Sequence, residues 1–180
     1  FMQSTHNTIS GQVAIMLQCK GYNFTYVHRG ASFEAALLDS LMLIEEGNAR
    51  NILVGGFDEN SQNLHITSAR MGHCKKENIN SLQLLESKTP GTISGEGSTF
   101  FMLTDKEDEN NYAVLNGLSV FYKPESETEV EQNLNDFLQR NNLSADDIDL
   151  VVYGLSGDVR TDNVFYNFQN NFLKKSDAAY

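Results

Sequence analysis

The chain has 180 residues, with 13 Lys or Arg and 24 Asp or Glu, so its formal net charge is −11 at pH 7. Hydrophobic residues make up 40% of it, which is enough for a packed core and excludes a disordered acidic tail. So negative a charge argues against nucleic acid or an anionic membrane as partner, because their phosphates attract Lys and Arg. No apolar run reaches the roughly 18 residues of a membrane-spanning helix, and two distant cysteines, Cys19 and Cys74, make no disulfide framework. We therefore expect a soluble, cytoplasmic protein.

The negative charge is concentrated in one part of the chain. Residues 1–104 carry 7 basic and 9 acidic side chains, a net charge of −2, whereas residues 105–162 carry 4 basic and 14 acidic side chains, a net charge of −10. The acidic part opens with the run 105–111, which has no apolar residue and is typical of an exposed connection. We place the boundary between two structural halves there, after residue 104.

The first third of the chain alternates between helical and strand patterns. Thr8 begins an apolar pattern at helical spacing that Gly21 ends, and residues 22–27 are rich in the aromatic and β-branched residues of strands. A second helix begins at Ser32, and apolar residues surround most of it, so we expect it to be buried on nearly all sides. Residues 51–57 form an apolar run of the buried-strand kind. This order favours parallel strands joined by crossover helices.

The later elements follow an interruption. Residues 58–91 have weak periodicity and indicate an excursion away from the sheet. Ser126 and Glu129 have the spacing of a capping box, and an apolar helical face follows them. The elements predicted in this part are strands over 98–103, 112–122 and 150–154, a helix from Ser126, and a final helix around Val164.

Two stretches resemble ligand sites only superficially. His65, His73 and Cys74 are zinc-ligating residue types, but their spacing fits no zinc motif and a fourth ligand is not evident. The glycine-rich stretch 91–97 lacks the Gly-Lys-Ser/Thr that opens a helix in phosphate-binding loops, so close backbone packing is the better interpretation. We predict no metal and no cofactor.

Candidate nucleophiles cluster before the second helix. Cys19 precedes Lys20, whose charge would lower a thiol pKa, but no histidine or asparagine partner is evident, so a structural thiol is the default. His28 and Ser32 flank a strand-to-helix turn, where side chains project beside a helix N-terminus. Gly30 supplies no side chain at this turn, and we interpret it as a residue chosen for positive φ.

Five stretches in the same order resemble the nucleophile region of the β-ketoacyl synthases and the segments that follow it. The likeness runs from about Ser10 to the end of the chain and is weakest over 60–90. The matching stretches are Ser10-Gly11-Gln12-Val13-Ala14-Ile15, Lys20-Gly21-Tyr22-Asn23, Glu45-Glu46-Gly47-Asn48-Ala49-Arg50 with Val54-Gly55-Gly56, Gly95-Glu96-Gly97-Ser98, and Leu143 to Asp149.

The resemblance implies a thiolase-like α/β fold, in which two similar halves form a layered α-β-α-β-α core. This chain would hold an incomplete core, with the later part of the N-terminal half over 1–104 and the beginning of the C-terminal half over 105–180. Family members condense an acyl group, held as a thioester on cysteine, with a malonyl group on an acyl carrier protein, while two histidines stabilise the developing negative charge. They usually dimerise through the strand before the nucleophile, here residues 22–28.

The catalytic residues of the family do not transfer to this chain. The nucleophilic cysteine falls on Gly30, and the first catalytic histidine falls on Tyr153 in Tyr153-Gly154-Leu155-Ser156. The second histidine and its lysine would lie beyond Tyr180. Glycine cannot form a thioester, and tyrosine cannot replace a neutral imidazole without changing the pocket. In this the chain is similar to chain-length factors, and to the divergent ketoacyl-synthase-like proteins of aryl-polyene and flexirubin pathways.

The leading hypothesis is a non-catalytic partner or chain-length-determining subunit in fatty-acid or polyketide-type biosynthesis, paired with a second copy or with a catalytic ketoacyl synthase. One alternative is an active acyltransferase in which His28, Ser32 or Cys19 replaces the missing cysteine. Another is a plain protein-interaction domain. An acyl pocket would be lined by Phe24, Tyr26, Phe33 and Phe57, although ordinary core packing explains them equally well. An acyl carrier protein, itself acidic, would dock near Lys20, Arg29 and Lys75-Lys76.

Overall fold

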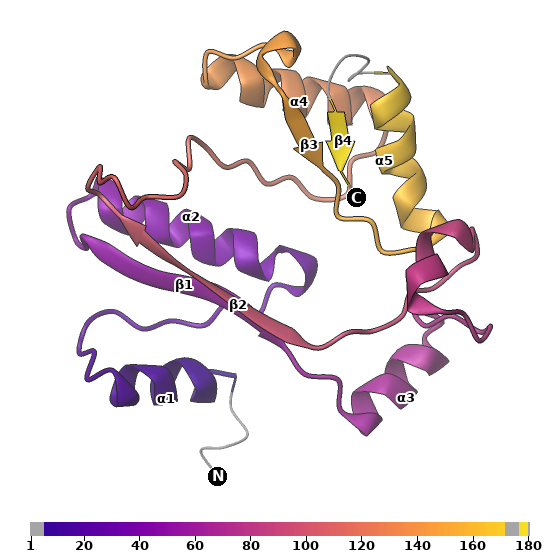
Figure 1. Cartoon of the computed structure of the whole chain (residues 1–180), viewed down its shortest axis with the longest axis horizontal. Coiled ribbons are helices and arrows are strands. Elements are labelled where there is room, and N and C mark those ends of the chain that lie inside the picture. Colours follow the sequence, from indigo (N-terminus) through magenta and orange to yellow (C-terminus); the bar gives the residue numbers. More distant parts are fainter. Residues whose placement is uncertain (1–5, 172–176, 180) are drawn as a thin grey trace. The chain divides into compact units, whose positions relative to one another are not determined.

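The computed structural model describes residues 6–171 and 177–179 (Figure 1). The chain divides into two compact units, and each unit is made of two separate stretches of the sequence. Unit 1 comprises Phe1–Phe57 and Ser98–Val120, and unit 2 comprises Asp58–Gly97 and Phe121–Tyr180. The boundary predicted after residue 104 concerns the two halves of the family fold, and it stays a prediction.

Unit 1 is built on a two-stranded sheet with one helix alongside it (Figure 1). The Asp105 amide, just after β2, donates to the Arg50 carbonyl, just before β1, at 3.1 Å, so the two strands run antiparallel. The parallel arrangement expected of strands over 22–27 and 51–57 is not formed among the described residues, because 22–27 has no strand assignment. Phe33 of α2 reaches the sheet, with its ring centroid 6.1 Å from that of Phe101. The elements are α1 (Thr8–Met16), a 3-10 turn (Arg29–Ala31), α2 (Ser32–Glu45), β1 (Asn51–Asp58) and β2 (Gly97–Thr104).

The segment 22–28, expected to contain a strand, has no strand assignment in the structure. It is held to α1 by side chains instead: the hydroxyls of Ser10 and Thr25 lie 2.8 Å apart, and the Asn23 side-chain amide donates to the Ser10 carbonyl at 2.9 Å. The expected strand over 112–122 is also absent. Aromatic and β-branched residues favour an extended backbone, but a strand also needs a neighbour to complete its hydrogen bonds, and none pairs with either segment among the described residues.

Unit 2 places two helices beside the parallel pair β3–β4 (Figure 1), in which Leu150 lies opposite Asp177. The helix expected from Ser126 is confirmed, because the Ser126 hydroxyl accepts from the Glu129 amide at 3.2 Å. The Glu129 carboxylate accepts from the Glu125 amide at 2.7 Å instead of closing the box on Ser126. The elements are α3 (Gln62–Arg70), a 3-10 helix (Ser81–Glu86), α4 (Glu127–Arg140), a 3-10 turn (Ala145–Asp147), β3 (Leu150–Val152), α5 (Val159–Asn171) and β4 (Asp177–Ala179).

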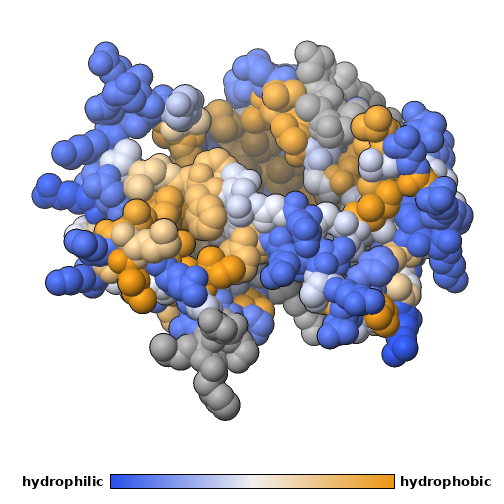
Figure 2. All heavy atoms as spheres, turned by 60° about the horizontal axis from the view of Figure 1, so that its bottom comes forward, coloured by the Kyte–Doolittle hydropathy of each residue, from blue (hydrophilic) through white to orange (hydrophobic). Residues whose placement is uncertain are grey.

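Few side chains of the described chain are fully buried, and the buried apolar residues are Val54, Leu138 and Tyr153. Figure 2 shows apolar side chains, in orange, at many places on the surface. The expectation that α2 is buried on nearly all sides is wrong, since Leu38 is 45% and Met42 is 49% exposed; little of the described chain covers that side of the helix. The expected α/β class is confirmed, and the core is incomplete.

None of the described helices combines the length and the apolar character needed to cross a bilayer.

Candidate functional site

Gly30 lies in the 3-10 turn that leads into α2, where the family likeness places the nucleophile. The interpretation that this turn needs positive φ is wrong, because the described glycines with positive φ are Gly47, Gly72, Gly91 and Gly157. A Cβ atom built on Gly30 meets no heavy atom within 4 Å. The backbone and the space at this position therefore accept a side chain, and the sequence supplies none.

His28 and Ser32 do come together across this turn, but through the backbone. The His28 amide donates to the Ser32 hydroxyl oxygen at 2.8 Å. This bond ties the first residue of α2, Ser32, to the chain that enters the helix. Cys19, the third candidate nucleophile, is exposed in the connection after α1. Ser32 is thus engaged with the backbone of the turn, and Cys19 lies outside it.

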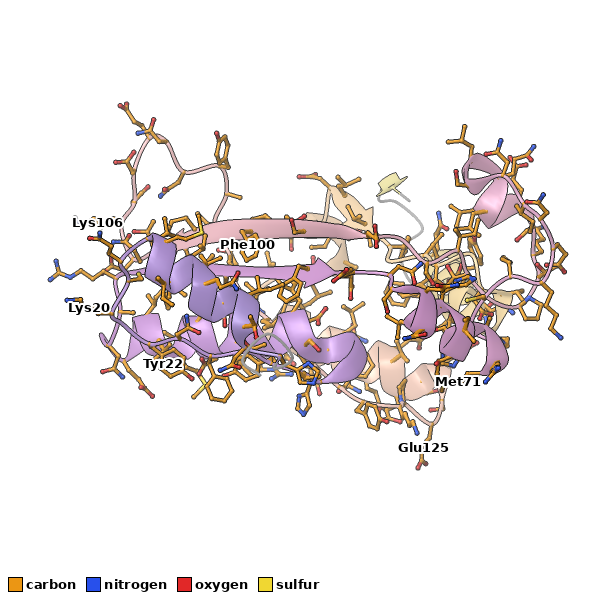
Figure 3. All side chains as sticks on the ribbon, turned by 90° about the horizontal axis from the view of Figure 1, so that it is seen from below. Lys20, Tyr22, Met71, Phe100, Lys106 and Glu125 are labelled. Carbon is orange, nitrogen blue, oxygen red and sulfur yellow. The ribbon has the colours of Figure 1, made fainter. Side chains whose placement is uncertain are left out.

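The four aromatic residues predicted to line an acyl pocket lie at separate places in unit 1. The rings of Phe24 and Tyr26 on the extended segment have centroids 5.0 Å apart, and Tyr22, labelled in Figure 3, stacks on Phe24 at 6.0 Å. Phe33 contacts the sheet from α2, as described above. Phe57 is the residue before last in β1, and its side chain is exposed. Tyr22, Phe24 and Tyr26 thus form a row of three contacting rings. Phe33 and Phe57 do not belong to this row.

Tyr26, at one end of this row of rings, is held on α2. Partial burial, followed by hydrogen bonds with Tyr22 and Asp39, raises the pKa of Tyr26 well above its ordinary value. Asp39 belongs to α2, so Tyr26 anchors the extended segment on that helix, whereas the rings of Tyr22 and Phe24 remain largely exposed. The segment 22–28 therefore presents aromatic surface and an unpaired backbone together.

Tyr153, which the family resemblance predicts at the position of the first catalytic histidine, is 7% exposed. Its ring packs on two rings of α5, with centroid distances of 5.8 Å to Phe165 and 6.5 Å to Phe168. The side chain is thus a member of the aromatic core of unit 2. A histidine here would lose much of that contact area, because an imidazole is smaller and more polar than a phenol ring.

The turn after Tyr153 is built around the carboxylate of Asp162, which is 3% exposed. One of its oxygens accepts from the amide and the hydroxyl of Ser156, both at 3.0 Å, and the other accepts from the Gly157 amide at 2.7 Å. A buried carboxylate that accepts several donors is a strong local organiser. Asp162 therefore fixes the direction of two consecutive backbone amides.

The segment 73–92 holds the same turn from its other side. The Lys75 ammonium donates to the Thr89 carbonyl at 2.6 Å, to the Thr89 hydroxyl at 3.0 Å and to the Gly157 carbonyl at 2.7 Å. The Thr92 hydroxyl donates to the Ser156 carbonyl. Residues about 64 to 82 positions apart in sequence thus form one hydrogen-bonded assembly, which we call the clamp.

An ion pair completes the clamp at the start of α5. The Arg160 guanidinium donates to both carboxylate oxygens of Asp158, at 2.9 and 3.1 Å from Nε, and to the Gly72 carbonyl at 2.9 Å. These hydrogen bonds from Arg160 hold the pKa of Asp158 well below its usual range. Asp158 is therefore an anion, bridging α5 and the 72–92 segment.

The packing of the clamp requires glycine at two positions, because a side chain at either one would overlap neighbouring atoms. Gly157 has φ +80° and a Cβ there would overlap the Leu84 side chain. Gly91 has φ +89° and a Cβ there would overlap the backbone of Cys74. The close packing expected for the 91–97 stretch is confirmed at Gly91 and is wrong at Gly95 and Gly97, where a Cβ would meet no heavy atom within 4 Å. Among the described residues, no group of three His, Cys, Asp or Glu side chains could hold a metal ion.

The residues of the clamp were not predicted from the sequence. Lys75 was assigned to carrier-protein docking, but its ammonium is engaged inside unit 2. The partner of Thr92, Ser156, lies far away in the sequence. Asp158 and Asp162 bind groups within six residues, but no motif considered for the sequence contains these pairs. The available signal in the sequence was the acidic residue in the first turn of the final helix, Asp162.

Three solved structures share the fold of this chain. The ishigamide ketosynthase/chain length factor aligns with a TM-score of 0.58 at 21% identity, over 81% of this chain and 38% of its own. The oxazolomycin ketosynthase domain OzmH KS7 of Streptomyces albus JA3453 aligns with 0.69 at 16% identity, over 97% and 33%. A β-ketoacyl synthase from Burkholderia phymatum STM815 aligns with 0.65 at 16% identity, over 96% and 46%. The chain spans about a third to a half of these structures.

Sequence comparison points the same way. No curated protein sequence matches the chain. The family described as "Beta-ketoacyl synthase, N-terminal domain" matches residues 1–109, which is more than half of it. The match includes the turn at Gly30, the β1–β2 sheet and the glycine-rich stretch before β2. The chain therefore belongs to the β-ketoacyl synthase family.

Proposed function

We propose that this chain is a non-catalytic ketoacyl synthase-like subunit of fatty-acid or polyketide-type biosynthesis, which pairs with a condensing enzyme and helps to set product length. The observation that carries the proposal is the turn at Gly30. The space for a nucleophile is open there, and no side chain occupies it. A condensing enzyme needs a thiolate at this point, since the acyl group must be held covalently between two half-reactions.

Tyr153 supports the same role from unit 2. Its ring is embedded against Phe165 and Phe168, so it contributes packing where the family has a histidine. The likeness to the ishigamide ketosynthase/chain length factor agrees with a chain-length role. In such a role the fold supplies a partner surface and part of the wall around a growing acyl chain, with Phe24, Tyr26, Phe33 and Phe57 as the lining to be tested.

The proposed partner surface is the segment 22–28. Its backbone has no strand partner among the described residues, and Tyr22, Phe24 and Val27 are each about 60% exposed. Exposed aromatic side chains along an unpaired extended backbone favour the addition of a strand from another chain. The partner is a second copy or a catalytic ketoacyl synthase.

Carrier-protein docking fits Lys20, Arg29 and Lys76 better than Lys75. The Lys75 ammonium already has three acceptors in the clamp, whereas the Lys76 side chain is exposed. An acidic carrier protein would be repelled by the 105–162 region at short range, with salt screening beyond roughly 10 Å.

The proposal is tested by acyl trapping. The protein is incubated with hexanoyl-coenzyme A and analysed by intact-mass and peptide mass spectrometry. We expect no acyl adduct on the natural chain and an adduct on the Gly30→Cys variant, because the variant has a thiol in the open space of the turn. An adduct on Cys19, His28 or Ser32 of the natural chain would instead support the active acyltransferase.

The partner surface is tested by sedimentation of the chain alone and mixed with a catalytic ketoacyl synthase. Phe24→Glu should abolish association, because it places a charge in an apolar interface, whereas Leu82→Glu, at a residue that is 90% exposed in unit 2, should not. A chain that stays monomeric and binds no synthase would contradict the partner role and favour a plain protein-interaction domain.

A further inference from the structure

One pair of neighbouring residues has a reactivity of its own, outside the site described above. Asn116-Gly117 is the only Asn-Gly pair in the sequence. The side-chain carbonyl carbon of an asparagine can be attacked by the backbone nitrogen of the residue that follows it. Glycine hinders this attack least, because it has no Cβ and the widest choice of backbone angles. The sequence therefore makes this pair the most reactive of its kind in the chain.

The structure leaves the pair accessible. It lies in the stretch 111–124, which has neither a helix nor a strand assignment, and the Asn116 side chain is exposed. Among the described residues, Asn116 has no hydrogen-bond partner. The attack requires the backbone at Asn116 to rotate until the Gly117 nitrogen faces the side-chain carbon. A segment outside helices and ladders can make that rotation without opening a cooperative unit of the fold.

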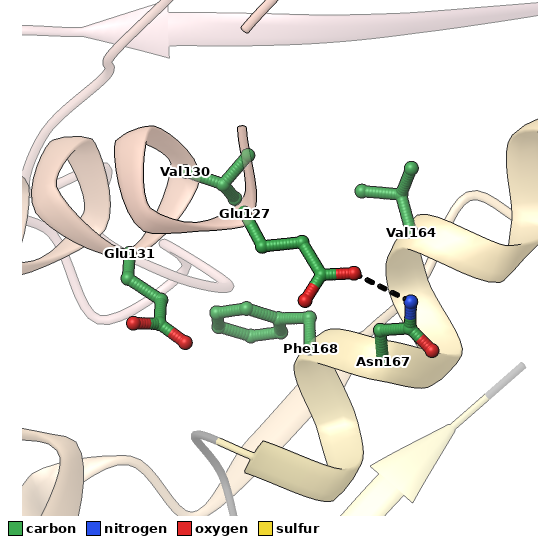
Figure 4. Close-up of a pocket in the computed structure, with 6 residues that line it drawn as sticks. All are labelled: Glu127, Val130, Glu131, Val164, Asn167 and Phe168. Carbon is green, nitrogen blue, oxygen red and sulfur yellow. Dashed lines mark hydrogen bonds between the residues drawn. The ribbon is translucent and has the colours of Figure 1, made fainter. Parts of the chain in front are cut away.

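Other asparagines of the chain are held in place. Figure 4 shows the Asn167 side-chain amide on α5 donating to Glu127 Oε1, at 2.6 Å. The Asn80 side-chain oxygen accepts from the Leu82 amide at 3.0 Å and caps the 3-10 helix that begins at Ser81. At both places the next residue belongs to a helix, so the rotation that brings the backbone nitrogen to the side chain would disturb that helix.

We propose that Asn116 is a site of spontaneous modification, at which the chain gains a carboxylate. The Gly117 backbone nitrogen forms a bond to the Asn116 side-chain carbonyl carbon, and the side-chain nitrogen leaves as ammonia with the Gly117 amide proton. Water then adds to one of the two carbonyl carbons of the five-membered imide and opens the ring, which gives aspartate or isoaspartate. Water is the only co-reactant, and no atom is oxidised or reduced. This reaction does not depend on the proposed biosynthetic role.

The products change the segment in two respects. Both add a negative charge, and isoaspartate also adds a methylene carbon to the backbone. The side chains of a strand alternate between its two faces, so an extra backbone atom puts the residues on either side of it out of register. Residues 112–122 have the composition of a strand, and isoaspartate at position 116 would keep them from pairing as one.

The test is a time course of the full chain at mildly alkaline pH, folded and unfolded in urea. Peptide mass spectrometry follows the gain of about one dalton at each asparagine, and an isoaspartyl methyltransferase labels isoaspartate. We expect Asn116 to react first, and at a similar rate in the folded and the unfolded chain. Asn80-Ser81 is the comparison within the same chain, and it should react roughly tenfold more slowly when folded than in urea, because the cap must open first.

Two variants complete the test. Gly117→Ala should slow the reaction at Asn116 roughly tenfold, because the added Cβ hinders the attacking nitrogen. Gly95→Ala, at a glycine that also has open space for a Cβ, should leave that rate unchanged. Rates in urea compare the variants whether or not each one folds. No gain at Asn116 in the folded chain, a gain there only in urea, or gains spread evenly over the asparagines would each overturn the proposal.

Discussion

The turn at Gly30 and the turn after Tyr153, where the family resemblance predicts the two catalytic positions, are held in different ways. At the Gly30 turn the His28 amide donates to the Ser32 hydroxyl oxygen, and space is open where a Cβ would stand. The turn after Tyr153 is fixed by the clamp, with a buried carboxylate, a half-buried ammonium and two glycines that admit no side chain.

The difference teaches that the two turns should respond differently to substitution. The Gly30 turn has open space for a side chain, so we expect it to accept one. The Tyr153 ring packs on Phe165 and Phe168 in the core of unit 2, so we expect that position to contribute to stability. The predictions below compare substitutions in the tight turn with those in the open turn.

The largest effect is expected from Asp162→Ala. The substitution removes the acceptor of two backbone amides and one hydroxyl in a buried place, and should lower the free energy of unfolding by about 3 to 5 kcal/mol. Urea unfolding followed by circular dichroism measures it. The exposed Asp149→Ala should change stability by less than about 0.5 kcal/mol. Equal effects of the two variants would mean that the clamp does not hold the turn.

The next effect concerns Gly157→Ala. At φ +80° an L-residue is strained, and the new methyl group would overlap Leu84, so we expect a loss of about 2 to 3 kcal/mol. Gly154→Ala is the control, because a Cβ there meets no heavy atom within 4 Å. A melting temperature for Gly157→Ala equal to that of Gly154→Ala would show that the turn can open at little cost.

A pH effect is expected from Asp158. Its folded-state pKa lies below the ordinary 3.8 because of Arg160, so its contribution to stability is present above that value and is lost as the pH falls below it. Between about pH 5 and pH 2 we expect the natural chain to lose roughly 1 to 2 kcal/mol through this group. Asp158→Asn should flatten the curve in that window, whereas the exposed Asp136→Asn should leave it unchanged. If stability depends on pH in the same way in all three proteins, Asp158 is not the cause of the loss at low pH.

The smallest effect is expected at the open turn. Gly30→Ala restricts the unfolded chain without a clash in the folded one, and should stabilise the protein by about 0.4 to 1 kcal/mol. Gly47→Ala should destabilise it by about 1 kcal/mol, since Gly47 has φ +72° although it also has open space. If Gly30→Ala destabilises instead, the turn is under a constraint that its open surroundings do not reveal, and the contrast between the two sites weakens.

Local patterns predicted the local elements well. The helix α4 begins where Ser126 and the apolar spacing place it, because both signals act within a few residues. The family and its fold could also be predicted, since they rest on short motifs in order, whereas the assignment of Gly30 and Tyr153 to the catalytic positions stays a prediction. Burial of α2 and the strand at 22–27 were wrong, because both depend on neighbours that local composition does not specify. The clamp could not be predicted, since its contacts join Lys75 to Gly157 and Thr92 to Ser156.

The chain passes between the two units three times, after residues 57, 97 and 120, because the excursion between β1 and β2 belongs to unit 2. During translation, β2 is made only after the whole excursion has been synthesised. Its partner β1 therefore stays unpaired until then. The clamp likewise cannot form until Asp162 has been synthesised, long after Lys75. Each unit is therefore completed only after the chain has returned to it, and a single proteolytic cut between residues 57 and 121 cannot separate the two units. Folding of this chain should depend strongly on protection of the exposed β1 edge during synthesis.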